Sequence, residues 1–246
     1  MKVALFIPCY IDQFYPQVGI ATLQLLQKLG CEVHYPLEQT CCGQPLANSG
    51  CETDAIPIYQ HYIQTFQNYN YIVCPSGSCT YHIRKHYDII SQTEAVQHVR
   101  QHTLDLAEFL LGVLKINQLN VSFPFKVGLH QSCHGLRGLR LGPDSERVIG
   151  GESKLHTLLK MVKDLELIPL ERVDECCGFG GTFAINESAI SVKMGKDRIT
   201  DHYKNGAEVI TAGDMSCLMH LEGIIKRQKY NIKIMHLAEI LNYTKL

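Results

Sequence analysis

The chain has 246 residues and a formal net charge of −1, from 23 basic and 24 acidic side chains. This length can bury a substantial core, either in one large domain or in two of about 120 residues. The balanced charge does not indicate a nucleic-acid or anionic-membrane partner, and no stretch approaches the roughly 18 apolar residues of a membrane span.

The first ten residues, "MKVALFIPCY", are predicted to form a strand and not a signal peptide. Their apolar run is short, is interrupted by Pro8, and is followed by Asp12 without a small-residue cleavage site. A protein without an export signal stays in a reducing compartment, where clustered cysteines more often bind metals or perform redox chemistry than form disulfides. We therefore expect a cytoplasmic protein whose cysteines, eleven in all, are candidates for such chemistry.

Strands and helices alternate through the first half of the chain. The segment 16–30 opens with Pro16 and closes with Gly30, as helices often do. Predicted strands cover 2–9, 32–38 and 71–79, and predicted helices cover 16–30, 56–68 and 105–115.

The same order restarts in the second half. Predicted strands cover 125–133, 166–171 and 208–217, predicted helices cover 154–165 and 187–206, and 232–241 combines a short strand with a short helix. Because such alternation favours parallel sheets flanked by helices, we predict an α/β fold of two pseudo-symmetric repeats, each with a mainly parallel sheet. The predicted repeats are residues 1–120 and 121–246.

Cysteines occur at matching points of the two predicted repeats, each directly after a predicted strand. Since ligands of parallel α/β sheets gather beyond the carboxyl ends of the strands, the cysteine-bearing loops of each repeat should converge on one site. The first repeat contributes Cys9, Cys41, Cys42, Cys74 and Cys79, and the second contributes Cys133, Cys176, Cys177 and Cys217. Cys31 and Cys51 have no counterpart and are expected to be small buried apolar residues.

The tripeptide Cys-Cys-Gly appears twice, in "TCCGQP" and in "ECCGFG". Neighbouring side chains point to opposite faces of a strand and diverge by roughly 100° on a helix, so both thiolates can serve one centre only where the backbone turns. Gly43 and Gly178 permit that turn. Thiolate ligands select zinc or an iron-sulfur cluster, and the five thiols of the first repeat exceed the four that tetrahedral zinc needs, which favours iron and sulfur.

Five segments carry a resemblance to known proteins: "FIPCYIDQFYP", "CCGQP", "CPSGSC", "SCHGLRGL" and "CCGFGGTFA". Together they resemble the lactate utilization protein A family, within the cysteine-rich CCG-domain proteins that include a cysteine-rich component of heterodisulfide reductase and the glycolate oxidase iron-sulfur subunit. The resemblance spans nearly the whole chain. It implies that the nine repeated cysteines bind an iron-sulfur cluster in each repeat, in the best-understood relatives a non-cubane 4Fe-4S cluster with five cysteine ligands, although zinc has also been placed in CCG domains.

The resemblance also implies an oxidoreductase subunit that transfers electrons during oxidation of L-lactate to pyruvate and is active in a complex. Its expected partners are a ferredoxin-like iron-sulfur subunit and a third subunit. Neither a complete flavin site nor a complete nicotinamide site is recognisable. The alternatives are a zinc-stabilised scaffold or binding protein without redox chemistry, and a thiol-disulfide enzyme, which is disfavoured because a redox-type C-x-x-C motif is missing.

The sequence departs from the broader CCG pattern at two places. The segment "CPSGSC" separates Cys74 from Cys79 more widely than C-x-x-C does, and the corresponding segment "AGDMSC" has Ala212 where Cys74 falls. Four thiolates in the second repeat would suit a cubane cluster, zinc, or a cluster with an exposed iron open to substrate or to Asp214.

The segment "HGLRGLRLG" that follows Cys133 offers candidate contacts for a substrate or a partner. Arg137 and Arg140 could each bind a carboxylate such as that of lactate in a bidentate manner, and His134, or His130 before the cysteine, could move a proton at neutral pH. The alternative interpretation is a solvated loop with a histidine bonded to backbone.

Overall fold

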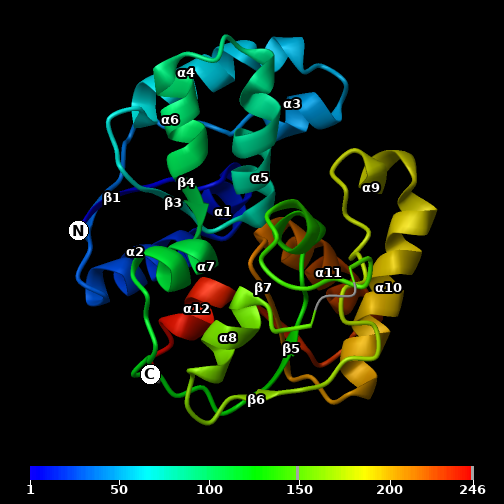
Figure 1. Ribbon diagram of the computed structural model, residues 1–246. Helices are drawn as coiled ribbons and strands as arrows, with labels where there is room; N and C mark the ends of the chain where they lie inside the picture. Colours follow the sequence, from blue (N-terminus) through cyan, green and yellow to red (C-terminus); the bar gives the residue numbers. More distant parts are fainter. Residues whose placement is uncertain (148–149, 245–246) are drawn as a thin grey trace.

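The computed structural model describes residues 1–147 and 150–244, and it contains two four-stranded sheets built from parallel strand pairs (Figure 1). The first sheet, ordered β2-β1-β3-β4, consists of β1 (Lys2–Leu5), β2 (Glu32–His34), β3 (Ile72–Cys74) and β4 (Thr103–Asp105). The second sheet, ordered β6-β5-β7-β8, consists of β5 (Lys126–Leu129), β6 (Glu166–Leu167), β7 (Val209–Ala212) and β8 (Lys233–His236). Because both sheets have the same strand order, the predicted α/β fold of two repeats is confirmed.

Helices connect the strands and cover the sheets. The first half contains α1 (Cys9–Phe14), α2 (Pro16–Lys28), α3 (Gln44–Asn48), η1 (Thr53–Ala55), α4 (Ile56–Phe66), α5 (Gly77–His86), η2 (Tyr87–Ile89), α6 (Glu94–His102), α7 (Leu106–Glu108) and the π-helical turn η3 (Phe109–Val113). The second half contains the π-helical turn η4 (His134–Gly138), α8 (Lys154–Lys160), α9 (Phe183–Asn186), α10 (Ser188–Lys204), α11 (Met215–Gln228) and α12 (Leu237–Leu241). Among the described residues, no helix is both long enough and apolar enough to cross a membrane.

Local sequence signals account for where the main helices begin and end. Pro16 occupies the first turn of α2, where a missing N–H costs nothing, and Gly30 follows the helix with a φ of +83°. The side chain of Ser76 accepts a hydrogen bond from the backbone N–H of Cys79 and so caps α5. The start of α5 is thus fixed directly beyond the end of β3.

The two repeats share one hydrophobic core. Val3 and Leu5 of the first sheet belong to the same buried cluster as Val127 and Leu129 of the second. Helix α2, drawn in blue, packs against α12, drawn in red, although these helices lie at opposite ends of the chain (Figure 1). The burial of apolar surface between the repeats holds the two sheets together. A division of the chain near residue 120 stays a prediction.

Candidate metal centres

The cysteines of each repeat lie beyond the carboxyl ends of three strands. Each set has one cysteine after the first strand, a Cys-Cys-Gly turn after the second, and one cysteine in the first turn of the helix that follows the third strand. Cys79 and Cys217 are each the third residue of their helix, α5 and α11. The topology therefore brings the thiols of each repeat to one edge of its sheet.

The thiols of the first repeat form a compact group. The Sγ atoms of Cys41 and Cys9 lie 3.7 Å apart, and those of Cys42 and Cys79 lie 3.4 Å apart. These distances are far longer than the roughly 2.05 Å of a disulfide bond, and each of the eleven cysteines is free in the described chain. Close free thiols at these distances can act together as metal ligands.

The Cys-Cys-Gly turn of the first repeat stabilises a thiolate. Hydrogen bonds from the thiols of Cys42 and Cys9, together with the N–H of Gly43 at 3.4 Å, lower the pKa of Cys41 to about 3. The hydrogen bond to Cys41, with burial, raises the pKa of Cys9 and of Cys42. One thiolate held among neutral thiols is an anionic site, and metal binding would release the remaining protons.

The second repeat reproduces this arrangement. Hydrogen bonds from the thiols of Cys133 and Cys177, and from the N–H of Gly178 at 3.3 Å, lower the pKa of Cys176 to about 2. The same bonds raise the pKa of Cys133 and of Cys177, which is also hydrogen-bonded to Cys217. The two Cys-Cys-Gly turns thus have the same hydrogen-bond pattern.

Both turns require glycine. The φ of Gly43 is +85° and that of Gly178 is +90°, values that L side chains rarely adopt. A Cβ atom on Gly43 would lie 2.5 Å from a ring carbon of Tyr59, and one on Gly178 would lie 2.6 Å from the carbonyl oxygen of Ser191. The backbone therefore approaches the following helix too closely for any other residue.

Cys74 differs from the other cysteines of its repeat. It is fully buried as the last residue of β3, and its thiol donates to the carbonyl oxygen of Ser76 at 3.6 Å. Burial and the charge of neighbouring Cys79 raise its pKa. Ala212 is the last residue of β7, so the second repeat lacks a thiol at this position. Of the two cysteines without counterparts, Cys31 is buried as expected, whereas Cys51 is partly exposed.

The two sets of cysteines open onto one cleft of about 670 Å³. The cleft wall also contains aromatic and polar side chains from both repeats, including Tyr10, Phe179, His134 and Asp214. Its cysteines are Cys9, Cys42, Cys79, Cys133, Cys176, Cys177 and Cys217. A molecule in this cleft would have access to both centres.

Asp214 connects the helices that carry the last cysteine of each repeat. It precedes α11, yet its buried carboxylate accepts hydrogen bonds from α5 and its cap in the other repeat. The donors are the hydroxyl of Ser76 at 2.7 Å, the backbone N–H of Ser78 at 3.0 Å and the Ser78 hydroxyl at 2.9 Å. These bonds cap α5 from across the repeat boundary, which occupies the carboxylate that the sequence suggested as an alternative ligand.

The three residues predicted to contact a substrate or partner lie in or beside η4, directly after Cys133. His134 lines the cleft. Arg137 forms ion pairs with Asp174 at 3.1 Å and Glu146 at 2.9 Å, and one of its N–H groups lies 3.7 Å from Cys133 Sγ. Arg137 thus joins the loops of Cys133 and the second Cys-Cys-Gly. Arg140, with a φ of +59°, pairs with the buried carboxylate of Asp144 at 3.1 Å.

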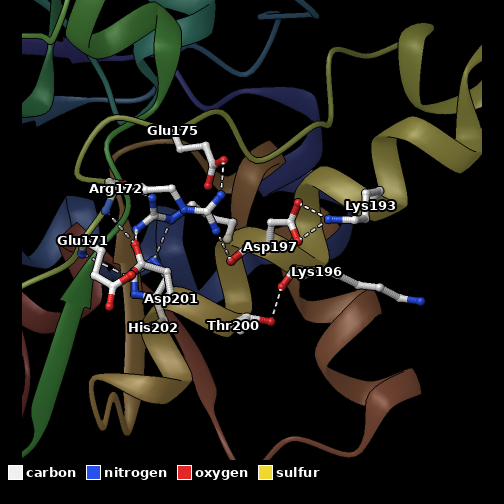
Figure 2. Close-up of polar contacts among 10 residues, drawn as sticks. Glu171, Arg172, Glu175, Lys193, Lys196, Asp197, Thr200, Asp201 and His202 are labelled. Carbon is white, nitrogen blue, oxygen red and sulfur yellow. Dashed lines mark hydrogen bonds and ion pairs between the residues drawn. The ribbon is translucent and has the colours of Figure 1, made fainter.

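A buried arginine, Arg198 of α10, lies behind the second centre and was missed by the sequence analysis. It is 0% exposed, forms an ion pair with Asp201 at 3.0 Å, and donates to His202 Nε2 at 3.2 Å. Asp201 also accepts the backbone N–H groups of Glu171 and Arg172 at 3.0 and 3.1 Å (Figure 2). This network attaches the segment before the second Cys-Cys-Gly to α10.

A buried histidine, His130, accompanies the thiols of the second repeat. Its ring, Cys177 and Cys217 offer ligand atoms that all lie within 4.8 Å of one another. Burial, with the nearby charge of Arg198, lowers the pKa of His130 to about 3. The sequence analysis considered this histidine only as a proton carrier, and its position three residues before Cys133 was the available signal.

The donor sets fit a thiolate-bound metal centre in each repeat. Thiols and one neutral imidazole are the ligands that zinc and iron-sulfur clusters prefer. Each set combines a stabilised thiolate with neighbouring neutral thiols, and the buried imidazole accompanies the second set. The described residues therefore provide four or five donors to each centre, with Cys74 as the fifth thiol of the first.

Comparison with known proteins agrees with this interpretation of the cysteines. The cysteine-rich CCG domain matches the chain twice, at residues 3–84 and 127–222. The lactate utilization protein A of an Exiguobacterium strain is 40% identical over 98% of this chain and 97% of its own length. The proteins of the same name from Halalkalibacterium halodurans (38% identity, 99% and 97% covered) and Bacillus subtilis (37% identity, 98% and 99% covered) are similarly related.

Proposed function

The chain belongs to the lactate utilization protein A family of CCG-domain proteins, and from this premise we propose that it is an iron-sulfur electron-transfer subunit of a complex that oxidises L-lactate to pyruvate. The observation that carries the proposal is the pair of matching thiol groups on one cleft. Each group contains a thiolate stabilised by two thiols and a glycine N–H.

Iron-sulfur clusters would supply one-electron transfer at these sites, with potentials tuned by ligation, hydrogen bonds to sulfur and burial. Oxidation of lactate to pyruvate releases two electrons and two protons. Two centres on one cleft suit the two electrons, and His134 on the cleft wall is the candidate proton carrier. The ligands that we propose are Cys9, Cys41, Cys42, Cys74 and Cys79 for the first centre, and Cys133, Cys176, Cys177 and Cys217 for the second.

Arg137 and Arg140 remain proposed contacts for lactate or for a partner. Both already pair with carboxylates, which favours a partner surface over a free carboxylate site in the case of Arg140, since its side chain is half exposed. The partners that we propose are a ferredoxin-like iron-sulfur subunit and a third subunit, and we place the complex in the cytoplasm. The isolated chain should not turn over lactate at a useful rate, because it offers no hydride-accepting cofactor site.

Anaerobic purification followed by iron, acid-labile sulfide and zinc analysis tests the proposal. We expect iron and sulfide in similar amounts with broad visible absorption. Stoichiometric zinc without sulfide would refute it. Lactate turnover by this chain alone, with iron as its only cofactor, would contradict the assignment as a subunit.

The second candidate function is a zinc-stabilised scaffold without redox chemistry. The four thiols of the second repeat are the number that a closed tetrahedral zinc site needs, and this observation alone favours zinc there. The surplus fifth thiol, Cys74, favours iron and sulfur in the first repeat. Metal analysis of Cys42→Ser and Cys177→Ser variants would reveal a mixed protein with zinc in one repeat.

A further inference from the structure

His130 is a buried histidine whose ring has no hydrogen-bond partner among the described residues. It directly follows β5, is 1% exposed, and leaves both Nδ1 and Nε2 without a partner. Its backbone is satisfied, since its N–H donates to the carbonyl oxygen of Thr211 at 2.8 Å. Buried polar groups are almost always paired, so an orphaned ring calls for a partner that the polypeptide does not provide.

The position of the ring identifies that partner. The ligand atoms of His130, Cys177 and Cys217 lie within 4.8 Å of one another. Metal bonds to thiolate sulfur and imidazole nitrogen are about 2.3 and 2.0 Å long, so small side-chain movements would let these donors share one ion or the neighbouring irons of one cluster.

A second histidine shows that the local fold can satisfy such a ring. His220, on α11, lies one helical turn beyond Cys217, and its Nε2 is 3.3 Å from the carbonyl oxygen of Ser191. His220 is therefore engaged with backbone, whereas His130 is not. The two histidines form a matched pair for experiment.

The first repeat has an aromatic residue at the place of His130. Phe6 directly follows β1 and precedes Cys9 by three residues, as His130 follows β5 and precedes Cys133. Phe6 contacts Tyr62 edge-on, with ring centroids 4.9 Å apart. An apolar ring satisfied by packing in one repeat is thus replaced by an unpartnered donor in the other.

The fifth donor changes strand between the repeats. In the first repeat, the last residue of β3 is Cys74 and the residue after β1 is Phe6. In the second repeat, the last residue of β7 is Ala212 and the residue after β5 is His130. Strands β5 and β7 are neighbours in the sheet, so the loss of a thiol on one is accompanied by the gain of an imidazole on the other.

We propose that His130 is a nitrogen ligand of the second centre, which would be held by four cysteines and one histidine while the first is held by five cysteines. The proposal rests on the proposed function in one respect, namely that a metal centre occupies the second repeat. The ligands of this centre are Cys133, Cys176, Cys177, Cys217 and His130.

Pulsed EPR of the reduced, anaerobically reconstituted full chain tests the proposal. The protein is labelled with ¹⁵N in histidine only, and His130→Phe, His130→Cys and His220→Gln are compared with the parent. Phenylalanine is the residue that the first repeat carries at this position, and cysteine restores a fifth thiol. We expect the coupling of a directly bonded histidine nitrogen in the parent and in His220→Gln, and its loss in both His130 variants.

Iron and sulfide content separates ligation from simple misfolding. His130→Cys should keep the iron and sulfide of the parent while losing the nitrogen coupling. Coupling that persists in the His130 variants, or that is missing from a parent loaded with iron and sulfide, would overturn the assignment of His130 and leave the proposed function intact.

Zinc without sulfide would defeat the proposed function, and cobalt substitution would then test His130 separately. Loss of His130 as a ligand should change the visible Co²⁺ absorption and weaken Co²⁺ binding at least about tenfold. Unchanged absorption and affinity in His130→Phe would overturn the proposal in that case as well.

Discussion

The two repeats hold similar thiols in contrasting surroundings. Behind the first centre, Phe6 packs edge-on against Tyr62 and Phe66, with ring centroids 4.9 and 5.8 Å away. Behind the second centre, the corresponding space contains His130 and the buried, hydrogen-bonded pair of Arg198 and His202. Ligand geometry has therefore been kept while the electrostatic environment has changed from apolar to cationic.

This contrast teaches that two centres on one scaffold can have different redox properties. A nearby positive charge favours the more negative, reduced form of a cluster, and an apolar environment disfavours added charge. A histidine ligand in place of a thiolate also raises the potential. We expect the second centre to have the more positive reduction potential, so that electrons would collect there.

The largest expected effect comes from removing one Cys-Cys-Gly thiol at a time. Cys42→Ser should abolish the first centre and Cys177→Ser the second, because each thiol lies in the middle of its own group. Iron analysis and EPR redox titration should show about half of the iron lost in each variant, and a different potential in the centre that remains. Loss of all iron in either variant would mean that the cysteines form one shared centre.

Replacing Arg198 should affect the second repeat alone. Arg198→Leu leaves the buried carboxylate of Asp201 without its cation, and breaking one side of a buried pair costs about 3–5 kcal/mol. Thermal unfolding should shift downward by roughly 6–20 °C for a chain of this size. The potential of the second centre should fall, while Arg198→Lys should retain most of it. A lower potential in the first centre instead would contradict the contrast between repeats.

Alanine at the two turn glycines should distinguish a soft neighbour from a rigid one. Both substitutions impose an unfavourable positive φ at a cost of about 1–3 kcal/mol. The added Cβ of Gly43→Ala meets the ring of Tyr59, whereas that of Gly178→Ala meets the backbone carbonyl of Ser191. Because a side chain can move more easily than helix backbone, Gly178→Ala should lower stability and iron content more. Equal losses in urea unfolding would refute this ranking.

The sequence was sufficient for the arrangement of the thiols because that arrangement follows from topology. Parallel strands end along one edge of a sheet, so cysteines placed after strands converge whatever the details of the loops. The alignment of Cys74 with Ala212 was also correct, since each residue ends an equivalent strand. Strand β4 escaped prediction because three residues, Thr103–Asp105, are too few to show an alternating pattern.

Contacts between distant residues could not be read from the sequence. Helices α5 and α11 begin at the cysteine segments that were assigned to strand ends, and the carboxylate that caps α5 is Asp214, far away along the chain. The buried role of Arg198 depends on Asp201 and on backbone carbonyls brought near by folding. A comparison of the repeats with each other, placing His130 opposite Phe6, was the signal that could have identified the extra donor.

The smallest expected effect concerns a second matched pair, Asp105 and His236. Each is the first residue of a capping box, after β4 and β8 respectively: Asp105 accepts the N–H of Ala107 at 2.8 Å, and His236 accepts that of Ala238 at 3.1 Å. Burial, with the charge of Glu108, raises the pKa of Asp105 to about 8. Burial lowers the pKa of His236 to about 4. Both side chains are therefore neutral in the folded protein near pH 6.

The two groups should make stability depend on pH with opposite signs. The usual pKa values are about 3.9 for aspartate and 6.5 for histidine in an unfolded chain. Between about pH 4 and 8 the folded state retains a proton on Asp105 that the unfolded state has lost, so this group lowers stability as pH rises. Between about pH 6.5 and 4 the unfolded state gains a proton on His236 that the folded state refuses, so this group lowers stability as pH falls.

Urea unfolding of the metal-free parent, Asp105→Asn and His236→Asn over pH 4–8 measures both slopes. Asparagine remains a good helix cap, and the difference from the parent cancels groups common to all three proteins, such as the thiolate of Cys41. The advantage of Asp105→Asn should grow with rising pH, and that of His236→Asn with falling pH, each by at most about 1.4 kcal/mol per pH unit. A pH-independent difference for either variant would mean that its side chain is charged in the fold, and that the two repeats do not use neutral caps of opposite acid-base character at equivalent positions.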